Sequence, residues 1–443
     1  MELKYTVEGR FSEVEMFGKA IGPKNNKLDF ILLDLLNLFI APLGGGAGAY
    51  VAYYFASSHH WNAGQIGMLL SIMAMCLAGA QIPAGLIIDH FPKRNQITAL
   101  ALGVIAISWL SMLIFPLQPV VLVSQVLIGL SCAFFAPALA SITLGLVGYE
   151  GLEHRLGRNG IFSHIGNMVT AVLVGLCTAY LSGQAIIGLL IFFSLLAALS
   201  ALGIRRQAPI INNASAKSLA QDCGERFHPL LKGLQGLFST RGSRIFAIAA
   251  LMYTFANASM LPLMVQLISK QGASAAAVQL PSSLLLTELV MIPVCFLASK
   301  YARLGRRPLL ILSYLFLVLR GLGFTFIKTP AMMVAMQILD GMSAGIFGLV
   351  VTLVIADFCR HNNRFNSTLA ALYMVLTLAN GLSEFSSGML ANNFGFSTAF
   401  AILTVIATVG LVIIVALLPE TRQASESILA ESKNGLSVAA TET

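Results

Sequence analysis

The sequence predicts an all-α membrane protein in which twelve transmembrane helices form two parallel six-helix repeats. Of its 443 residues, 57% are hydrophobic and only 10% are charged, whereas about 25% of the residues of a typical soluble domain are charged. Twelve apolar segments are each long enough to cross a bilayer, and one loop sequence recurs about half a chain apart. Backbone groups in lipid must find partners within their own segment, so the spans are expected to be helices rather than strands.

The expected spans divide the chain into two halves joined by a polar linker. The linker, 205–244, carries seven Arg or Lys residues and separates six spans from six more. We therefore expect a cytoplasmic N-terminal segment at 1–28, six-helix halves at 29–204 and 245–418, and a cytoplasmic tail at 419–443. The twelve spans are predicted at 29–55, 64–88, 96–115, 119–147, 160–181, 184–204, 245–268, 277–299, 308–327, 330–356, 367–391 and 396–418.

The distribution of basic residues predicts the orientation of the helices. If residues 1–28 are cytoplasmic, 24 of the 27 Lys and Arg residues lie in cytoplasmic loops or tails. Lys270 and Lys328 fall in outside loops and Arg320 falls within a span, an asymmetry that the positive-inside rule predicts. The net charge of +8 then reflects topology and contact with the lipid bilayer, not a nucleic-acid partner. We expect a multi-pass protein of the bacterial inner membrane with both termini in the cytoplasm.

A ten-residue loop sequence occurs twice. The first copy, 85–94 (GLIIDHFPKR), and an eroded second copy, 298–307 (ASKYARLGRR), begin 213 residues apart. A helix that ends in Gly-x-x-x-Asp and is followed by a turn with two cations resembles the signature cytoplasmic loop of the major facilitator superfamily. The resemblance covers about 29–422 and implies the fold of that superfamily, in which two six-helix repeats expose a central site alternately to each side.

The resemblance implies a latch at the first copy. In the family, the Asp of this loop faces the start of helix 11 and a nearby Arg, and so holds the two halves together on the cytoplasmic side. In this chain these residues are Asp89 and Arg364. Gly85 is expected to allow close approach of helices, and Lys93 and Arg94 match the paired cations of the family.

The second copy has lost part of this motif. Ala298 and Ala302 replace the Gly and the Asp, which leaves Gly305, Arg306 and Arg307. The latch is therefore expected to be one-sided and carried by the first half. The alternative is that the paired cations of both copies only anchor the loops at the membrane surface.

Ionisable residues inside membrane spans are energetically expensive and point to function. Asp340 and Glu288 lie near mid-depth of their spans, Asp34 in the inner part and Glu384 in the outer part. By the helix arrangement of the family, Asp340 is the best-placed proton-coupling residue and Glu288 the second, since a desolvated carboxyl can hold a proton near neutral pH. Asp34 is a further coupling candidate, and Glu384 a candidate for the cavity or the outer mouth. Alternatively, Arg320 pairs with Glu288 as a structural ion pair.

Neutral polar residues interrupt several apolar spans and are candidates for a substrate cavity. His164 and Asn167 are three residues apart and share one helix face. His164 is a further proton-coupling candidate, with a neutral interhelical hydrogen bond as the alternative. Tyr50, Tyr53 and Tyr54 are either substrate contacts or part of an aromatic belt at the membrane interface. The full set of cavity candidates is Asn37, Tyr50, Gln125, Asn167, Asn257, Asn380, Glu384 and Arg320.

Other parts of the sequence indicate which branch of the superfamily the chain resembles. Its proton-driven drug exporters carry an Arg on helix 4 and a Gly-Pro-rich motif in helix 5, whereas this chain has Gln125 at the Arg position and no Gly-Pro in helix 5. The stretches 37–44, 144–148 with 157–159, and 337–341 resemble a bacterial branch with members associated with legiobactin-type siderophores. That resemblance implies a polycarboxylate substrate, but the few cations expected in the cavity argue against it.

The expected function is secondary active transport of a small organic solute by alternating access, coupled to protons, with a siderophore or related polycarboxylate among the candidate substrates. The sequence contains no Walker A pattern, hydrolytic triad or metal-ligand motif, so we expect neither an enzyme nor a cofactor nor a metal, and we expect a monomer. Two alternatives stay open. One is a passive facilitator or an exporter of unrelated small molecules, and the other is a non-transporting membrane sensor.

Overall fold

The chain folds into long helices that run along one common direction. The computed structural model describes residues 27–91, 93–147, 152–204, 234–271, 273–302, 305–359 and 365–421, and within these ranges it contains no strand. In chain order the elements are α2 (Lys27–Ala41), the short π-helical segment η2 (Pro42–Gly46), α3 (Ala47–Ser58), α4 (Ala63–His90), α5 (Arg94–Ile114), α6 (Gln118–Cys132), α7 (Phe135–Val147), α8 (Leu152–Tyr180), α9 (Gly183–Gly203), α12 (Arg241–Ala258), α13 (Met260–Gln271), α14 (Ala273–Tyr301), α15 (Arg307–Phe326), α16 (Pro330–Ala335), α17 (Gln337–Cys359), α18 (Phe365–Phe394) and α19 (Phe396–Leu417).

These helices form the twelve predicted spans. Eleven helical stretches in the described ranges are long and apolar enough to cross a membrane, and α2 with α3, bent by 46°, makes a twelfth when the pair is counted as one span. Several spans consist of two helical pieces, and prolines mark three of the breaks. Pro42 begins η2, and Pro137 and Pro262 occupy the third position of α7 and α13. Proline lacks an amide hydrogen and its ring clashes with the preceding turn, so the helix breaks on its N-terminal side.

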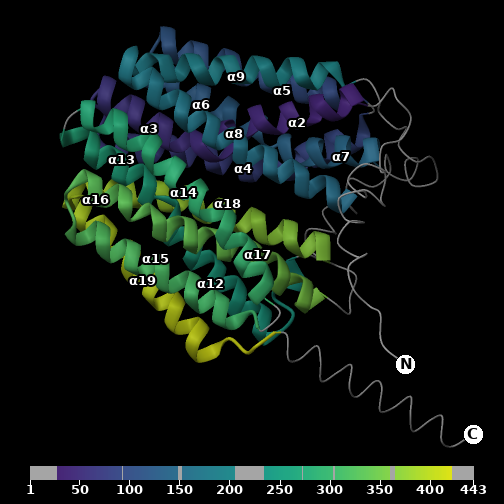
Figure 1. The fold of residues 1–443 in the computed structure, drawn as a ribbon, viewed down its shortest axis with the longest axis vertical. Coiled ribbons are helices and arrows are strands. Elements are labelled where there is room, and N and C mark those ends of the chain that lie inside the picture. Colours follow the sequence, from purple (N-terminus) through teal and green to yellow (C-terminus); the bar gives the residue numbers. More distant parts are fainter. Residues whose placement is uncertain are drawn as a thin grey trace, which may run out of the picture.

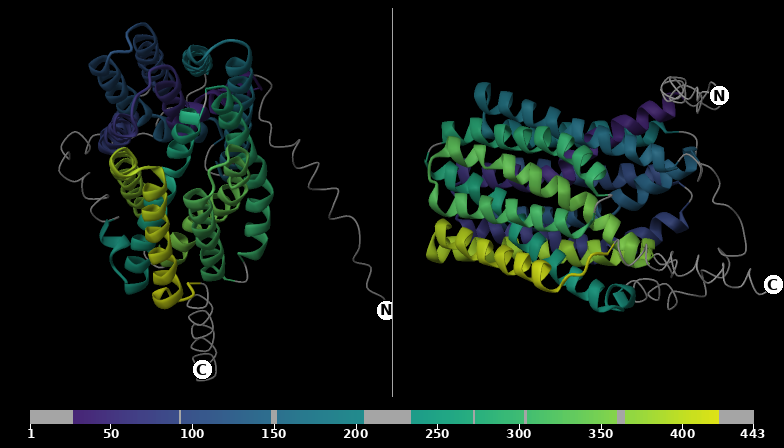
Figure 2. Two further views of the ribbon diagram at one scale, coloured as in Figure 1. Left: turned by 90° about the vertical axis from the view of Figure 1, so that its left-hand side faces the viewer. Right: turned by 60° about the horizontal axis from the view of Figure 1, so that its bottom comes forward.

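The spans form two groups of six, as the sequence predicts. Figure 1 shows α2–α9 as one group, in purple to blue-green, and α12–α19 as the other, in green to yellow. The right-hand view in Figure 2 shows the helices of both groups running along the same axis. The first described helix begins and the last one ends at the same end of the bundle, as an even number of spans requires.

That end carries most of the positive charge, and we call it the basic end. Of the 13 Lys and Arg residues in the described ranges, ten lie there, whereas Lys270 and Lys328 lie at the opposite end and Arg320 lies inside a span. The ten are Lys27, Lys93, Arg94, Arg155, Arg158, Arg241, Arg244, Lys300, Arg306 and Arg307.

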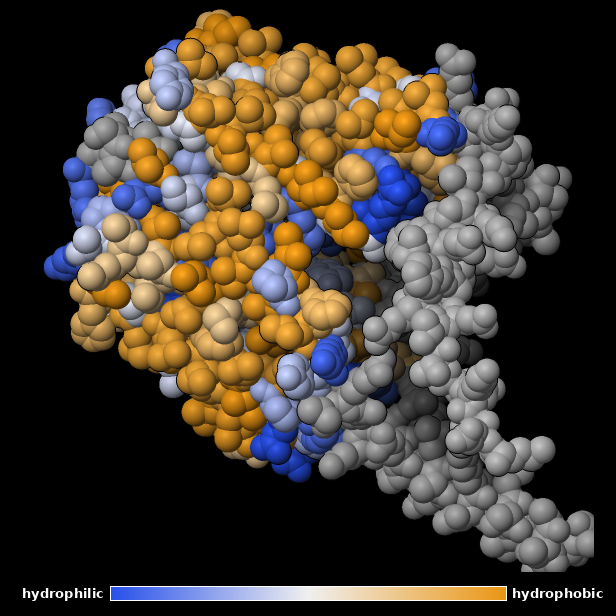
Figure 3. Space-filling view, in the orientation of Figure 1, coloured by the Kyte–Doolittle hydropathy of each residue, from blue (hydrophilic) through white to orange (hydrophobic). Residues whose placement is uncertain are grey.

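The flanks of the bundle are apolar. Figure 3 shows hydrophobic side chains, in orange, over most of the visible surface. Leu100 of α5, Phe296 of α14 and Val405 of α19 are 61–73% exposed. Apolar exposure on this scale is unfavourable in water and is what a lipid-facing surface requires.

The two halves pack closely at the end opposite the basic end. There α4 packs against α18, and α3 against α13. A side chain at Gly67 of α4 would collide with the Glu384 backbone, and a Cβ at Gly388 of α18 would lie 2.6 Å from the Ala63 carbonyl oxygen. Toward the basic end, a Cβ at Gly85 meets no described atom within 4 Å, and Figure 3 shows the surface hollowed between the halves. The close approach expected at Gly85 is not seen among the described residues, because the halves diverge there.

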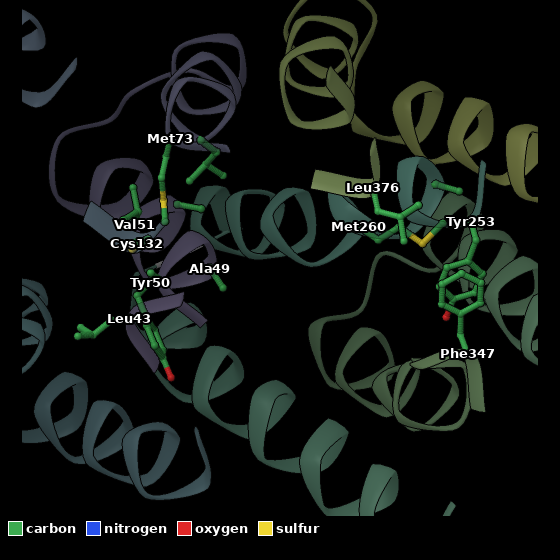
Figure 4. Close-up of a cluster of buried hydrophobic side chains, with 14 of the residues drawn as sticks. Leu43, Ala49, Tyr50, Val51, Met73, Cys132, Tyr253, Met260, Phe347 and Leu376 are labelled. Atoms are coloured by element: carbon green, nitrogen blue, oxygen red, sulfur yellow. The ribbon is translucent and has the colours of Figure 1, made fainter. Parts of the chain in front are cut away.

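Each half has its own tightly packed interior. Figure 4 shows Leu43, Val51 and Met73 gathered in the first half and Tyr253 with Phe347 in the second. The rings of Tyr253 and Phe347 are stacked with their centroids 3.6 Å apart. Because close-packed interiors deform little, each half is suited to move as a unit.

Candidate transport site

One acidic side chain joins the two halves in the middle of the bundle. Glu288 belongs to α14 of the second half, and His164 and Asn167 belong to α8 of the first. The Glu288 Oε2 atom lies 2.7 Å from His164 Nδ1, and Asn167 Nδ2 donates a hydrogen bond of 2.8 Å to Glu288 Oε1. We call these three residues the interhalf bridge.

The packing of α8 against α14 sets the geometry of this bridge. The two helices approach closely at Gly175, where a Cβ would lie 3.2 Å from Pro281 Cγ. A small residue at such a crossing lets two membrane helices come together. His164 and Asn167 lie on one face of α8, as their three-residue spacing predicts, and both reach Glu288.

The bridge can change its hydrogen bonds when it gains or loses a proton. The side chains of His164 and Glu288 are 37% and 12% exposed, so the pair is within reach of solvent. An ionised Glu288 accepts hydrogen bonds at both oxygens, and His164 donates to it when Nδ1 carries the hydrogen. A protonated carboxyl turns one of its acceptor sites into a donor. Proton binding at the bridge therefore alters a contact between the two halves.

Asp340 takes part in a buried ion pair inside the second half. Arg320 Nη1 donates to Asp340 Oδ1 at 2.6 Å and to Asn257 Oδ1 at 2.7 Å, and Arg320 is only 1% exposed. The alternative pairing of Arg320 with Glu288 is wrong, because α15 packs against α17 and so brings Arg320 to Asp340 instead. Asp340, the leading proton-coupling candidate, and Asn257, a cavity candidate, are thus both bonded to Arg320. The three residues lie on α17, α12 and α15 of the second half.

Asp34 is held by two arginines that sequence reasoning did not connect with it. Arg155 Nη2 lies 2.6 Å from Asp34 Oδ1, and Arg158 Nη2 lies 2.7 Å from Asp34 Oδ2. Arg155 also donates to the Phe30 carbonyl oxygen at 3.1 Å. These bonds tie the start of α8 to α2, so Asp34 has a structural role, and its proton-coupling role stays a prediction. A feature of the sequence that could have indicated this pairing is the three-residue spacing of the two arginines at the start of the fifth span, which places them on one helix face.

Two further cavity candidates lie inside the first half. Asn37 Nδ2 donates to the Leu33 carbonyl oxygen at 2.8 Å, and Gln125 Nε2 lies 3.9 Å from Met112 Sδ. Both polar side chains are buried. Asn380 of α18 is half-buried. The structure therefore brings only part of the predicted cavity set to the boundary between the halves.

Three tyrosines near the outer part of the first span are buried. Tyr50, Tyr53 and Tyr54 are at most 4% exposed. An aromatic belt would present its rings to the lipid headgroups, so the aromatic-belt interpretation is wrong. Figure 4 shows the Tyr50 ring extending away from Met73, and Tyr50 lies close enough to Glu288 to interact with it electrostatically. Tyr50 therefore stays a candidate substrate contact.

The latch at the first loop motif lies partly outside the described residues. Arg364 is outside them, and so is the side chain of Asp89, so their pairing stays a prediction. Lys93 is exposed, and Arg94 Nη1 donates to the Ser141 carbonyl oxygen at 3.3 Å within the first half. This cation thus binds α7 of its own half.

The second loop motif binds the end of the last span. The backbone N–H groups of Arg306 and Arg307 donate to the Glu420 carboxylate at 2.8 and 3.1 Å, and Arg306 Nε donates to Asp357 Oδ2 at 3.2 Å. A Cβ at Gly305 would lie 2.8 Å from Glu420 Oε2. A carboxylate at the start of a helix satisfies free N–H groups and favours the helix dipole. Arg306 therefore does more than anchor a loop, and it connects α15, α17 and the segment after α19.

Sequence comparison identifies relatives over most of the chain. The family model of the Major Facilitator Superfamily matches residues 35–331 and 247–441. Two proteins described as uncharacterized MFS-type transporters, from Mycobacterium tuberculosis strains CDC 1551 / Oshkosh and ATCC 25618 / H37Rv, are each 29% identical over 390 residues. The matches cover 88% of this chain and 93% of each relative.

Solved transporter structures share the fold. A variant of the nucleoside transporter NupG superposes with a TM-score of 0.74 at 15% identity, over 88% of this chain and 100% of the other. A variant of the peptide transporter POT gives 0.69 at 12% identity, over 91% and 97%. An inward-facing, unoccupied bacterial homologue of the human lysosomal transporter Spinster gives 0.67 at 13% identity, over 89% and 97%. At these identities the likeness establishes the fold alone.

Proposed function

The chain belongs to the Major Facilitator Superfamily, and we propose that it is a proton-coupled secondary transporter that moves a small organic solute across the bacterial inner membrane by alternating access. Membership of this superfamily makes it a multi-pass membrane transporter and not an enzyme. The observation that carries the proposed coupling is the interhalf bridge, in which one titratable acid bonds to both a histidine and an amide of the other half.

In this proposal the basic end faces the cytoplasm. Ten described Lys and Arg residues at that end against two at the opposite end support this orientation. Both termini are then cytoplasmic, and the segments 1–28, 205–244 and 419–443 belong to that side. With this orientation the described conformation is closed toward the outside, where Gly67 and Gly388 cross, and opens toward the cytoplasm.

Glu288 is the proposed carrier of the coupled proton, with His164 as its partner. While Glu288 is ionised, Asn167 and His164 bond to it and hold α8 against α14. A proton on Glu288, or a solute that takes over one of these bonds, frees the two helices to separate. Asp340 is less suited to this task, since its ion pair with Arg320 lies within one half and does not connect the two.

The proposed solute is small, polar and not strongly anionic. Asn167 and Tyr50 supply hydrogen-bonding groups near the bridge, and His164 is the partly exposed titratable base beside them. A siderophore or related polycarboxylate needs cations, and Arg320 is buried in its own ion pair. NupG and POT are named for nucleoside and peptide transport, and we extend to this chain only the general class of polar organic solutes.

The proposal is tested with purified protein in proteoliposomes that contain a pH-sensitive dye. Uridine, dialanine and citrate are added outside in turn, and solute-dependent movement of protons is recorded. We expect one of these classes to drive proton movement in the natural protein. Glu288→Gln should abolish that movement while solute exchange without a gradient persists, and Glu288→Asp should retain part of it.

Two results would overturn the coupling. Unchanged proton movement in Glu288→Gln would remove this residue from the mechanism. Solute equilibration in the natural protein without any proton movement would instead make the protein a passive facilitator. Solute binding without flux would support a sensor.

A further inference from the structure

A second acidic residue lies between the halves, at the end that the proposed orientation makes the outside. Glu384 of α18 sits where this helix crosses α4, and its backbone touches Gly67. Its side chain lines a small pocket of about 10 Å³ between the two halves, room for about one water molecule. No residue of the interhalf bridge lines this pocket.

The walls of this pocket contain no compensating charge. From α4 they include Gly67 and Leu70, and from α18 Ser387 and Gly388. The region of α12 and α13 contributes Ser259, Pro262, Leu263 and Gln266. A carboxylate packed between helices without a cation is strongly disfavoured, and the neutral acid is not.

Gln266 supplies an independent reason for a neutral acid. Its side chain is 3% exposed, and its Oε1 atom has no hydrogen-bond donor among the described residues. A buried acceptor without a donor is costly. The hydroxyls of Ser259 and Ser387 also line this pocket, but they bond to Ser383 and to the Glu384 carbonyl oxygen. Protonated Glu384 adds a further donor to the pocket. Protonation thus removes the need for a counter-charge and adds a donor for Gln266.

The same glutamine connects the pocket to the outer surface. Gln266 also lines a larger pocket of about 450 Å³ at the outer end, together with His60, Trp61 and Lys270. His60 and Lys270 are the titratable groups of that outer pocket, and neither lines the pocket of Glu384. Gln266 thus lies between the two pockets, and the pocket of Glu384 is next to the outer pocket.

We propose that Glu384 is a second proton-binding residue, which is protonated while the outer ends of the halves are closed and whose deprotonation opens them. The inference rests on alternating access by the two halves, but it does not depend on Glu288 or on the identity of the solute. An ionised Glu384 is stabilised by more water than this pocket holds, which has room for about one molecule, so ionisation favours a state in which α4 and α18 move apart. External pH would then set how readily the carrier opens outward.

The chain contains two tryptophans that make this testable by fluorescence. Trp61 lines the outer pocket, whereas Trp109 of α5 is fully buried. In Trp109→Phe protein, acrylamide quenching reports the accessibility of Trp61 alone. We expect quenching to increase about two-fold between about pH 5 and about pH 9, as the outer end opens.

Matched variants identify the group responsible. The pH dependence should vanish in Glu384→Gln, which stays closed, and should persist in Glu384→Asp, in Glu288→Gln and in His60→Gln. Persistence in Glu384→Gln would overturn the proposal, and loss in His60→Gln would assign the effect to direct quenching by that ring. If Trp109→Phe does not fold, the same comparison is made with both tryptophans present, since Trp109 is shielded from the quencher. Loss of proton-coupled transport in Glu288→Gln with the quenching profile intact would separate this site from the coupling site.

Discussion

The Asn167 side chain of the first half donates a 2.8 Å hydrogen bond to Glu288 of the second half. This bond links two helices whose relative movement alternating access requires. A hydrogen bond to a charged group contributes about 1.5–3 kcal/mol, which is enough to shift a conformational equilibrium at least tenfold. The strength of the bridge should therefore influence the transport rate directly.

Replacing Asn167 with Ala removes a bond that holds α8 against α14, so it should favour the state in which these helices are apart by about tenfold and change the rate of solute counterflow in proteoliposomes. The matched control is Thr170→Ala, because Thr170 lies one turn further along α8 and bonds to the Gly166 carbonyl oxygen of its own helix. Counterflow in Thr170→Ala should stay near that of the natural protein. Equal rates in the two variants would show that the amide bridge does not limit transport.

The Arg320–Asp340 pair should matter for stability more than for coupling. Removing one partner of a buried ion pair costs about 3–5 kcal/mol, whereas replacing both by apolar residues can be nearly neutral. Arg320→Met and Asp340→Leu should each lower the free energy of unfolding in detergent, and the double variant should be more stable than either. If the two losses simply add, the pair does not act as a unit. Asp340→Asn should leave proton movement driven by solute in place.

The glycine crossing at the end opposite the basic end should decide which side of the carrier is open. Gly67→Leu places a side chain against the Glu384 backbone and should prevent closure. Gly79→Leu is the control on the same helix, since a Cβ there meets no described atom within 4 Å. Quenching of Trp61 by acrylamide should rise in the first variant only. An unchanged signal in Gly67→Leu would mean that the crossing tolerates a side chain.

The loop residue His59 should make the stability of the folded protein depend on pH. Burial lowers the pKa of His59 below its ordinary value, and the charge of the neighbouring His60 lowers it further. Its Nε2 atom has no partner among the described residues. As pH falls through the ordinary value of about 6.5, the unfolded chain takes up a proton that the folded protein resists, so stability falls.

Thermal melts at about pH 7.5 and about pH 5.5 test this dependence. The loss of melting temperature on acidification should be smaller in His59→Asn than in the natural protein. His60→Asn should change this loss less, because burial is the larger cause of the lowered pKa of His59 and the charge of His60 is the smaller one. An identical loss in His59→Asn and the natural protein would assign the pH dependence to other groups.

Much of the architecture follows from the sequence because membrane spans leave strong one-dimensional signals. Long apolar runs, the clustering of Lys and Arg and the repeated loop predict the twelve spans and the two halves. Side-chain partners leave no such signal. In the sequence, Asp340 and Glu288 are both isolated acids in apolar helices. Only the packing of α15 against α17 shows that Arg320 forms its ion pair with Asp340.

Partners that are distant in sequence were the hardest to predict. Asp34 lies 121 residues from Arg155, and Glu420 lies 114 residues from Arg306. The spacing of His164 and Asn167 did place them on one face, but nothing local indicated that this face meets α14. The tyrosines of the first span were ambiguous for the same reason, because aromatic residues near a helix end serve both lipid interfaces and buried contacts.

The breaks at Pro42 and Pro262 occur in the first span of each half and leave short tips, α3 and α13, at the outer end. These tips pack against each other, while α2 is separately tied to α8 through Asp34. A tip that is mechanically separate from the rest of its span can swing before the whole half rotates. In the proposed alternating-access cycle, such a tip would close one end before the other opens, so that the solute would pass through an occluded intermediate and no continuous path would cross the membrane.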